Sequence, residues 1–120
     1  MKRDMDLVRE ILLEMETWNV DQRDREIVIK GHTPEEITYH LGLMHQAGLI
    51  KAADASSRDG EAWLPVDILW DGHEFLEASR NETIWAKAKQ KALTTTGTLT
   101  LEALKVALSL LIKQAVMAGF

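Results

Sequence analysis

The sequence predicts a small α+β fold in the order helix, short strand, helix, β-hairpin and further helices. Three observations support this prediction. Residues 33–36 read Thr-Pro-Glu-Glu, which combines a hydroxyl cap, a proline at the first helical position and a glutamate that can close a capping box. Two strand-like runs flank the small polar loop at residues 54–61. Residues 101–118 repeat apolar side chains at helical spacing.

A capping residue predicts the first helix, and a run of β-branched residues predicts the first strand. Asp4 can cap a helix over about 5–17. Its apolar positions fall at i, i+3, i+4 and i+7, and they are Val8, Ile11, Leu12 and Met15. Residues 19–25 are polar and predict a loop that could contain a short helical turn. The β-branched run in Glu26–Lys30 predicts a strand ending before Gly31.

The helix that begins at Thr33 presents two different faces. Its inward residues are Ile37, His40, Leu41, Met44 and Ala47. Among them, His40 is expected to be a hydrogen-bonded core residue. Gly48 is the expected left-handed stop. The opposite face carries Glu35, Tyr39, Gly42 and Gln46.

A hairpin follows, with arms predicted at Leu49–Ala53 and Ala62–Trp70. Pro65 has no N–H to donate, so the second arm should have an outward side or a bulge there. Alternation predicts that Val66, Ile68 and Trp70 share one face. Of the four tryptophans, Trp63 is the one expected to be exposed, because it lies beside the hairpin loop.

Capping residues also divide the last third of the chain. Asp71 with Glu74 predicts a second capping box, which opens a helix through about Arg80. Asn81 can cap a helix over about 82–93, which the threonines and glycine of residues 94–97 should break. Thr98 or Thr100 then begins a last helix that runs to about Ala118.

Length and composition set limits on the class of protein. At 120 residues we expect a single domain, with residues 1–80 as its core and residues 81–120 as a C-terminal helical extension of that domain. The absence of cysteine excludes disulfides and thiolate metal sites. No signal peptide or membrane-spanning run is expected, so a cytoplasmic location and no membrane partner are predicted.

A helix that ends in Ala-Gly-Leu-Ile at residues 47–50 and leads into a hairpin is typical of a winged-helix arrangement. The segment Tyr39–Ile50 resembles the recognition helix and first wing strand of bacterial winged-helix repressors. Over nearly the full length, the chain is similar to an uncharacterised group of bacterial and prophage proteins, domain of unknown function family 2513. That likeness rests on Met1–Arg9, Tyr39–Ile50, Trp70–Leu76 and Trp85. It implies a winged-helix-like fold and a phage or mobile-element context, without an established activity.

The resemblance to repressors predicts a prophage-associated, DNA-binding transcriptional regulator whose partner is double-stranded DNA. The residues expected to contact DNA are Thr38, Tyr39 and Gln46 on the helix and Arg58 in the hairpin loop. The net charge of −5 and the two glutamates of residues 35 and 36 oppose phosphate binding. The alternative is a protein-interaction module that binds a phage or host regulator through the acidic helix face and the apolar last helix.

The last helix is apolar over more of its circumference than one small domain can cover. Its predicted dimer or partner interface consists of Ala103, Val106, Leu110 and Met117. We therefore expect a homodimer. No residues have the spacing of a metal site, a nucleophile with its base, or a phosphate loop, so no enzymatic activity, metal or cofactor is expected.

Overall fold

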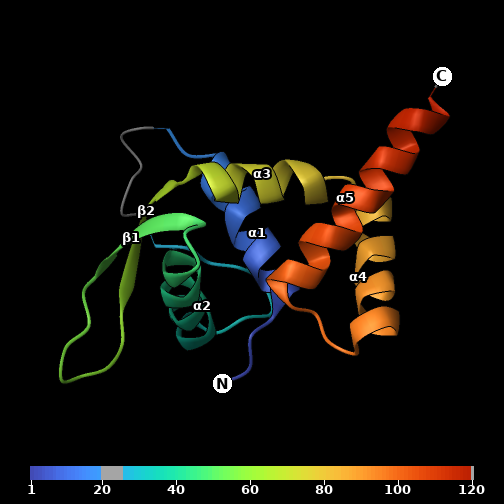
Figure 1. The fold of residues 1–120 in the computed structure, drawn as a ribbon. Helices are drawn as coiled ribbons and strands as arrows, with labels where there is room; N and C mark the ends of the chain where they lie inside the picture. The colour runs from blue at the N-terminus through green and yellow to red at the C-terminus, as the bar shows by residue number, and fades with distance from the viewer. Residues whose placement is uncertain (20–25, 120) are drawn as a thin grey trace. The chain divides into compact units, whose positions relative to one another are not determined.

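A computed structural model describes residues 1–19 and 26–119 of the chain. Within these residues the structure has five helices and one two-stranded antiparallel sheet (Figure 1), which confirms the α+β part of the predicted fold class. The elements are α1 (Met5–Glu16), α2 (Pro34–Gln46), β1 (Ile50–Asp54), β2 (Trp63–Ile68), α3 (Trp70–Ser79), α4 (Glu82–Thr96) and α5 (Leu101–Ala118). None of these helices is long and apolar enough to cross a membrane.

The chain divides into two compact units, Met1–His73 and Glu74–Phe120. The first unit contains α1, α2, the hairpin and the start of α3. The second contains the rest of α3 together with α4 and α5. The boundary falls within α3, a few residues before the end of the predicted core region at residue 80.

In the first unit, α1 supplies more buried apolar side chains than any other element. Asp4 caps it as predicted, because its carboxylate accepts hydrogen bonds from the backbone N–H groups of Asp6 and Leu7. All four predicted inward residues are buried, and Met5 and Leu7 join them. Burying six apolar side chains on one helix is the main local stabilisation of this unit, at about 1.5–3 kcal/mol for each large side chain.

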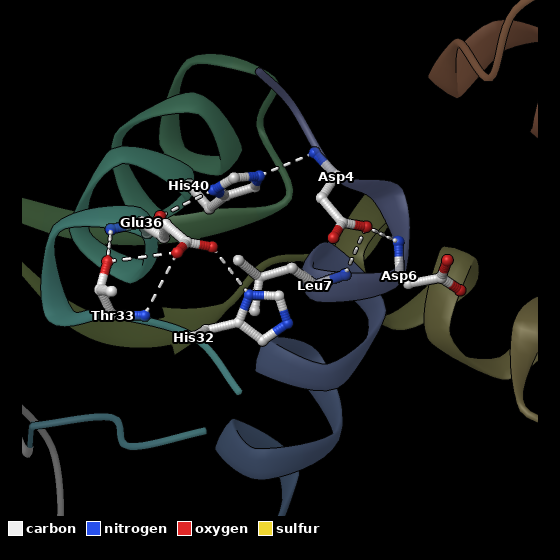
Figure 2. Close-up of polar contacts among 7 residues, drawn as sticks. All are labelled: Asp4, Asp6, Leu7, His32, Thr33, Glu36 and His40. Carbon is white, nitrogen blue, oxygen red and sulfur yellow. Dashed lines mark hydrogen bonds and ion pairs between the residues drawn. The ribbon is translucent and has the colours of Figure 1, made fainter. Parts of the chain in front are cut away.

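His40 of α2 makes two backbone hydrogen bonds, one within α2 and one to Asp4 at the start of α1 (Figure 2). Its Nδ1 lies 2.7 Å from the Glu36 carbonyl oxygen, which can only accept, so Nδ1 carries the proton. Its Nε2 is therefore the acceptor for the Asp4 N–H, at 2.8 Å. The side chain is only 1% exposed. The prediction of a hydrogen-bonded core histidine is confirmed.

The ends of α2 and the hairpin also follow the sequence. Thr33 and Glu36 form the predicted capping box, and Gly48 has a φ of 76°, the left-handed stop. The two strands pair antiparallel, with a register shift after Lys51 that leaves an extra residue in β2 next to Pro65. The predicted bulge is therefore present. It makes Pro65 and Ile68 the buried residues of β2, so the simple alternation predicted for this arm is wrong.

The predicted strand Glu26–Lys30 is wrong: no strand is present there. Ile27 is buried and Val28 is 78% exposed, so the segment anchors one side chain without joining the sheet. A β-branched run favours extended backbone, but a strand also needs a partner edge, and β1 pairs only with β2 among the described residues. The predicted loop of residues 19–25 and its possible helical turn lie outside the described residues, apart from Asn19.

Two further boundaries differ from their predictions. Trp70 is the first residue of α3 rather than the end of a strand, and Asp71 lies within the first turn rather than at the cap. The backbone of α3 passes close to the Leu49 carbonyl oxygen at Gly72. Only glycine fits there, because a Cβ at this position would lie 2.1 Å from that oxygen. That carbonyl accepts a hydrogen bond from the Leu69 N–H, which fixes the chain just before the helix.

In the second unit, α4 begins after Asn81 as predicted but continues through the threonines to Thr96. The prediction that residues 94–96 break the helix is therefore wrong. The helix ends at Gly97, whose φ is 80°. Thr94 and Thr96 lie within the helix, and each hydroxyl donates to the carbonyl four residues earlier. Thr100 caps α5, and α5 packs beside α4.

We expect His40→Leu to lower the free energy of unfolding by about 1–3 kcal/mol, because leucine fills the space but leaves the Asp4 N–H without its acceptor. Urea denaturation measures the effect. Gln46→Leu, an exposed change on the same helix, should stay within about 0.5 kcal/mol of wild type. Equal stability of the two variants would contradict the role of the imidazole.

Candidate functional site

The N-terminal turn of α2 is the end that would enter a DNA groove, and it carries carboxylates. Glu35 is exposed, while Glu36 is half-buried and bonded to its neighbours. Glu36 Oε2 lies 3.0 Å from His32 Nδ1, and its other oxygen bonds the Thr33 hydroxyl at 3.3 Å. The hydrogen bond with Glu36 raises the pKa of His32, and the same bond lowers the pKa of Glu36. Glu35 and Glu36 nevertheless place two carboxylates where a DNA phosphate would lie, and this opposes phosphate binding.

One side of α2 is covered by the hairpin. The Thr38 hydroxyl accepts a hydrogen bond of 2.7 Å from the Trp63 N–H, so this predicted DNA contact ties β2 to α2. The Trp63 indole lies over Gly42, where a Cβ would come within 2.7 Å of the indole nitrogen. Gly42 is buried for this reason, although the helical pattern predicted it on the outward face.

His45 completes the contact between α2 and the hairpin. Its ring stacks at a tilt on Trp63, with centroids 5.3 Å apart, and its Nδ1 accepts the Ala52 N–H at 3.2 Å. Thr38, Gly42 and His45 therefore form one docking side of α2. The helical spacing could have identified this side, but only knowledge of where the hairpin returns shows that it is occupied.

The remaining outward stripe of α2 holds the other predicted contacts. Gln46 is exposed and Tyr39 is half-buried, with its ring edge-on to His40 at 5.7 Å. Arg58 is exposed in the tight turn closed by the Ser57 and Gly60 backbone hydrogen bonds. Two helix residues and one loop residue thus remain accessible. Around Arg58, however, the loop also carries exposed Asp54, Asp59 and Glu61.

The most exposed tryptophan among the described residues is Trp70, not Trp63 as predicted. Trp63 is half-buried on α2, whereas Trp70 is 76% exposed at the start of α3. The indole N–H of Trp63 is buried without a hydrogen-bond partner. Trp63 is therefore an anchor of the hairpin rather than an exposed contact residue.

The second unit has its own candidate surface on α5. Leu104, Ala107 and Leu108 are buried, and the large apolar residues on the other side are exposed. Their exposed fractions are 53% for Val106, 42% for Leu110, 56% for Val116 and 71% for Met117. Ala103 is half-buried beside them. The structure therefore brings the four predicted interface residues onto one side of α5, three of them exposed.

A groove of about 370 Å³ follows this apolar side. One wall is α5, with Ala103, Val106, Ala107 and Leu110, and the other is α4, with Lys91, Ala92, Thr95 and Thr96. A second groove, of about 550 Å³, lies between α3 and the later turns of α5, and Phe75, Val116 and Met117 are among its lining. Both grooves are mainly apolar, which suits protein contacts. In the described part of the chain, no three His, Asp or Glu side chains gather as metal ligands would.

Fold and site together describe a small α+β protein with a helix–hairpin unit and a helical unit that bears an exposed apolar face. Residues 2–98 match the sequence model of the family described as "Hypothetical protein (DUF2513)". The chain belongs to the DUF2513 family, as its sequence pattern indicated. It is also 34% identical, over 117 residues, to an uncharacterized protein of Haemophilus influenzae, covering 95% of this chain and 98% of that one. No solved structure matches the chain.

We expect Gly42→Ala to destabilise the protein by about 1–3 kcal/mol, because the added methyl displaces the Trp63 ring. In a Trp63→Ala background the same change should stabilise it by about 1 kcal/mol, through the helix propensity of alanine. Urea denaturation of the four proteins gives this double-mutant cycle. Stabilisation in both backgrounds would contradict the placement of the indole.

The His32–Glu36 pair predicts a pH-dependent difference between wild type and His32→Ala. The pKa of His32 is raised above 6.5, so its stabilisation is complete below that pH and is lost as the pH rises through the folded-state value. The pKa of Glu36 is lowered from 4.5, so its stabilisation is complete above that pH and is lost at more acidic pH. The difference in free energy of unfolding should be larger at about pH 5.5 than at about pH 9. An equal difference at both pH values would exclude the pair.

Proposed function

We propose that this protein is a non-enzymatic protein-interaction module that associates with a second copy of itself through α5. The observation that carries the proposal is the row of exposed apolar side chains on α5. Val106, Leu110 and Met117 are each more than 40% exposed on one side of the same helix. Contiguous exposed apolar patches on small proteins mark interaction sites.

The charge distribution favours protein contacts over DNA. The unit Met1–His73 carries eight Lys and Arg against fifteen Asp and Glu, a net charge of −7. The remaining residues carry six and four, a net charge of +2. The helix–hairpin unit that would have to bind a phosphate backbone is thus the acidic one, and its field repels nucleic acid.

DNA binding through a winged-helix arrangement is the second candidate. It is supported by the order of α2, Gly48 and the hairpin, and by the accessible Tyr39, Gln46 and Arg58. On this proposal Tyr39 and Gln46 contact base edges while Arg58 binds phosphate, and Thr38 acts indirectly by holding the hairpin. A dimer formed through α5 would suit either candidate.

Light scattering tests the first proposal. Wild type should have the mass of a dimer, and Leu110→Glu should shift it to the monomer, because a carboxylate would be buried in an apolar contact. Leu93→Glu is a matched control, since Leu93 is 44% exposed on α4 and does not line the groove, while Leu110 is 42% exposed. The control should remain dimeric. A monomeric wild type at all concentrations would overturn the proposal.

Titration with duplex DNA at low and physiological salt tests the second candidate. DNA binding predicts an affinity that falls steeply with salt and weakens with Arg58→Ala, whereas Lys51→Ala, away from the hairpin tip, serves as a control. On the first proposal, wild type shows no salt-dependent binding to duplex DNA. Salt-dependent binding that requires Arg58 would establish the winged-helix candidate instead.

A further inference from the structure

Four of the apolar residues on the exposed side of α5 form a strip that runs along the helix. At 100° per residue, Ala103, Val106, Leu110 and Met117 fall within about 60° of the circumference. Their spacing of three, four and seven residues is that of a helix that packs lengthwise against another helix. The strip therefore fits a partner helix better than a globular surface.

The charges beside the strip are arranged asymmetrically. Glu102 lies near the start of α5 and Lys113 near its end, and both follow the same edge of the strip, about 20° apart. The opposite edge, from Ala107 to Gln114, carries no charge. In a twofold antiparallel helix pair, like edges face each other with their ends exchanged, so Glu102 of each helix meets Lys113 of the other. In a parallel pair the two charges would instead face the edge of α5 that has no charge of its own and runs beside the α4 wall with Lys91.

We propose that two copies pair with their α5 helices antiparallel, centred near Leu108, with Val106 of each copy packed against Leu110 of the other. This arrangement rests on the proposed function and specifies its partner and geometry. It forms two Glu102–Lys113 ion pairs, one at each end of the contact. It also opposes the two helix dipoles, which is the favourable orientation.

The α5 helix of the partner copy would lie along the groove between α4 and α5. The alanines at positions 92, 103 and 107 leave a shallow floor, so a second helix can approach closely beside Val106 and Leu110. The last turns of α5 extend past the start of α4 (Figure 1), and residues 113–118 are all exposed. In the antiparallel pair, this projecting end, including Met117, lies over the groove of the other copy. The two helix pairs then form a four-helix arrangement.

Charge reversal tests the pairing. Glu102→Lys and Lys113→Glu should each weaken the dimer about tenfold, because two attractive pairs become repulsive. The double variant should restore the wild-type dissociation constant, as measured by analytical ultracentrifugation at low salt. Lys105→Glu, about 80° from Lys113 on the same helix, is the control and should leave the constant unchanged. If the double variant failed to restore association, the proposed Glu102–Lys113 ion pairs would be excluded.

Spin labels test the orientation directly. The chain has no cysteine, so Ala118→Cys provides a single labelling site at the exposed end of α5. Antiparallel pairing centred near residue 108 separates the two labels by about 30 Å, and parallel pairing brings them to about 10 Å. A dimer that Leu110→Glu abolishes but that shows the short distance would overturn this arrangement alone. A monomer would overturn the proposed function with it.

Discussion

The buried imidazole of His40 is the constraint on which the helix–hairpin unit depends. It accepts the N–H of the residue that caps α1 and donates to a carbonyl of α2, so it sets where the first helix begins relative to the second. An apolar side chain could fill the same space but could not satisfy both groups. The cap of α1, the core face of α2 and the buried position of His40 are therefore parts of one arrangement.

One face of α2 packs against α1, and the hairpin covers a second side of the same helix. Trp63 docks over Gly42 and stacks on His45, while its backbone bonds Thr38. What remains of α2 is a narrow stripe that begins with carboxylates. A helix held on two sides has little surface left to read DNA, which is the structural reason that the proposed function lies with α5.

In the second unit, by contrast, α5 is only partly covered by other elements of its own unit. α4 covers one side of α5, and four large apolar residues stay exposed on the rest. Exposed apolar area of this kind carries a free-energy cost in water that a second helix removes. The family model ends at residue 98, before α5, whereas the alignment with the Haemophilus protein reaches into that helix. That relative therefore also has a segment that corresponds to α5.

The sequence by itself determined the features that depend on neighbours within four residues. The caps at Asp4, Thr33, Asn81 and Thr100, the stop at Gly48 and the inward stripe of α1 were all predictable, because their partners lie in the same turn of chain. The inward position of His40 and the apolar width of α5 followed from helical periodicity. The tertiary structure alone decided that Ile27 joins no strand, that Gly42 lies under Trp63 and that the Thr38 hydroxyl is used internally. Each of these depends on a partner distant in sequence, whose position local propensity does not encode.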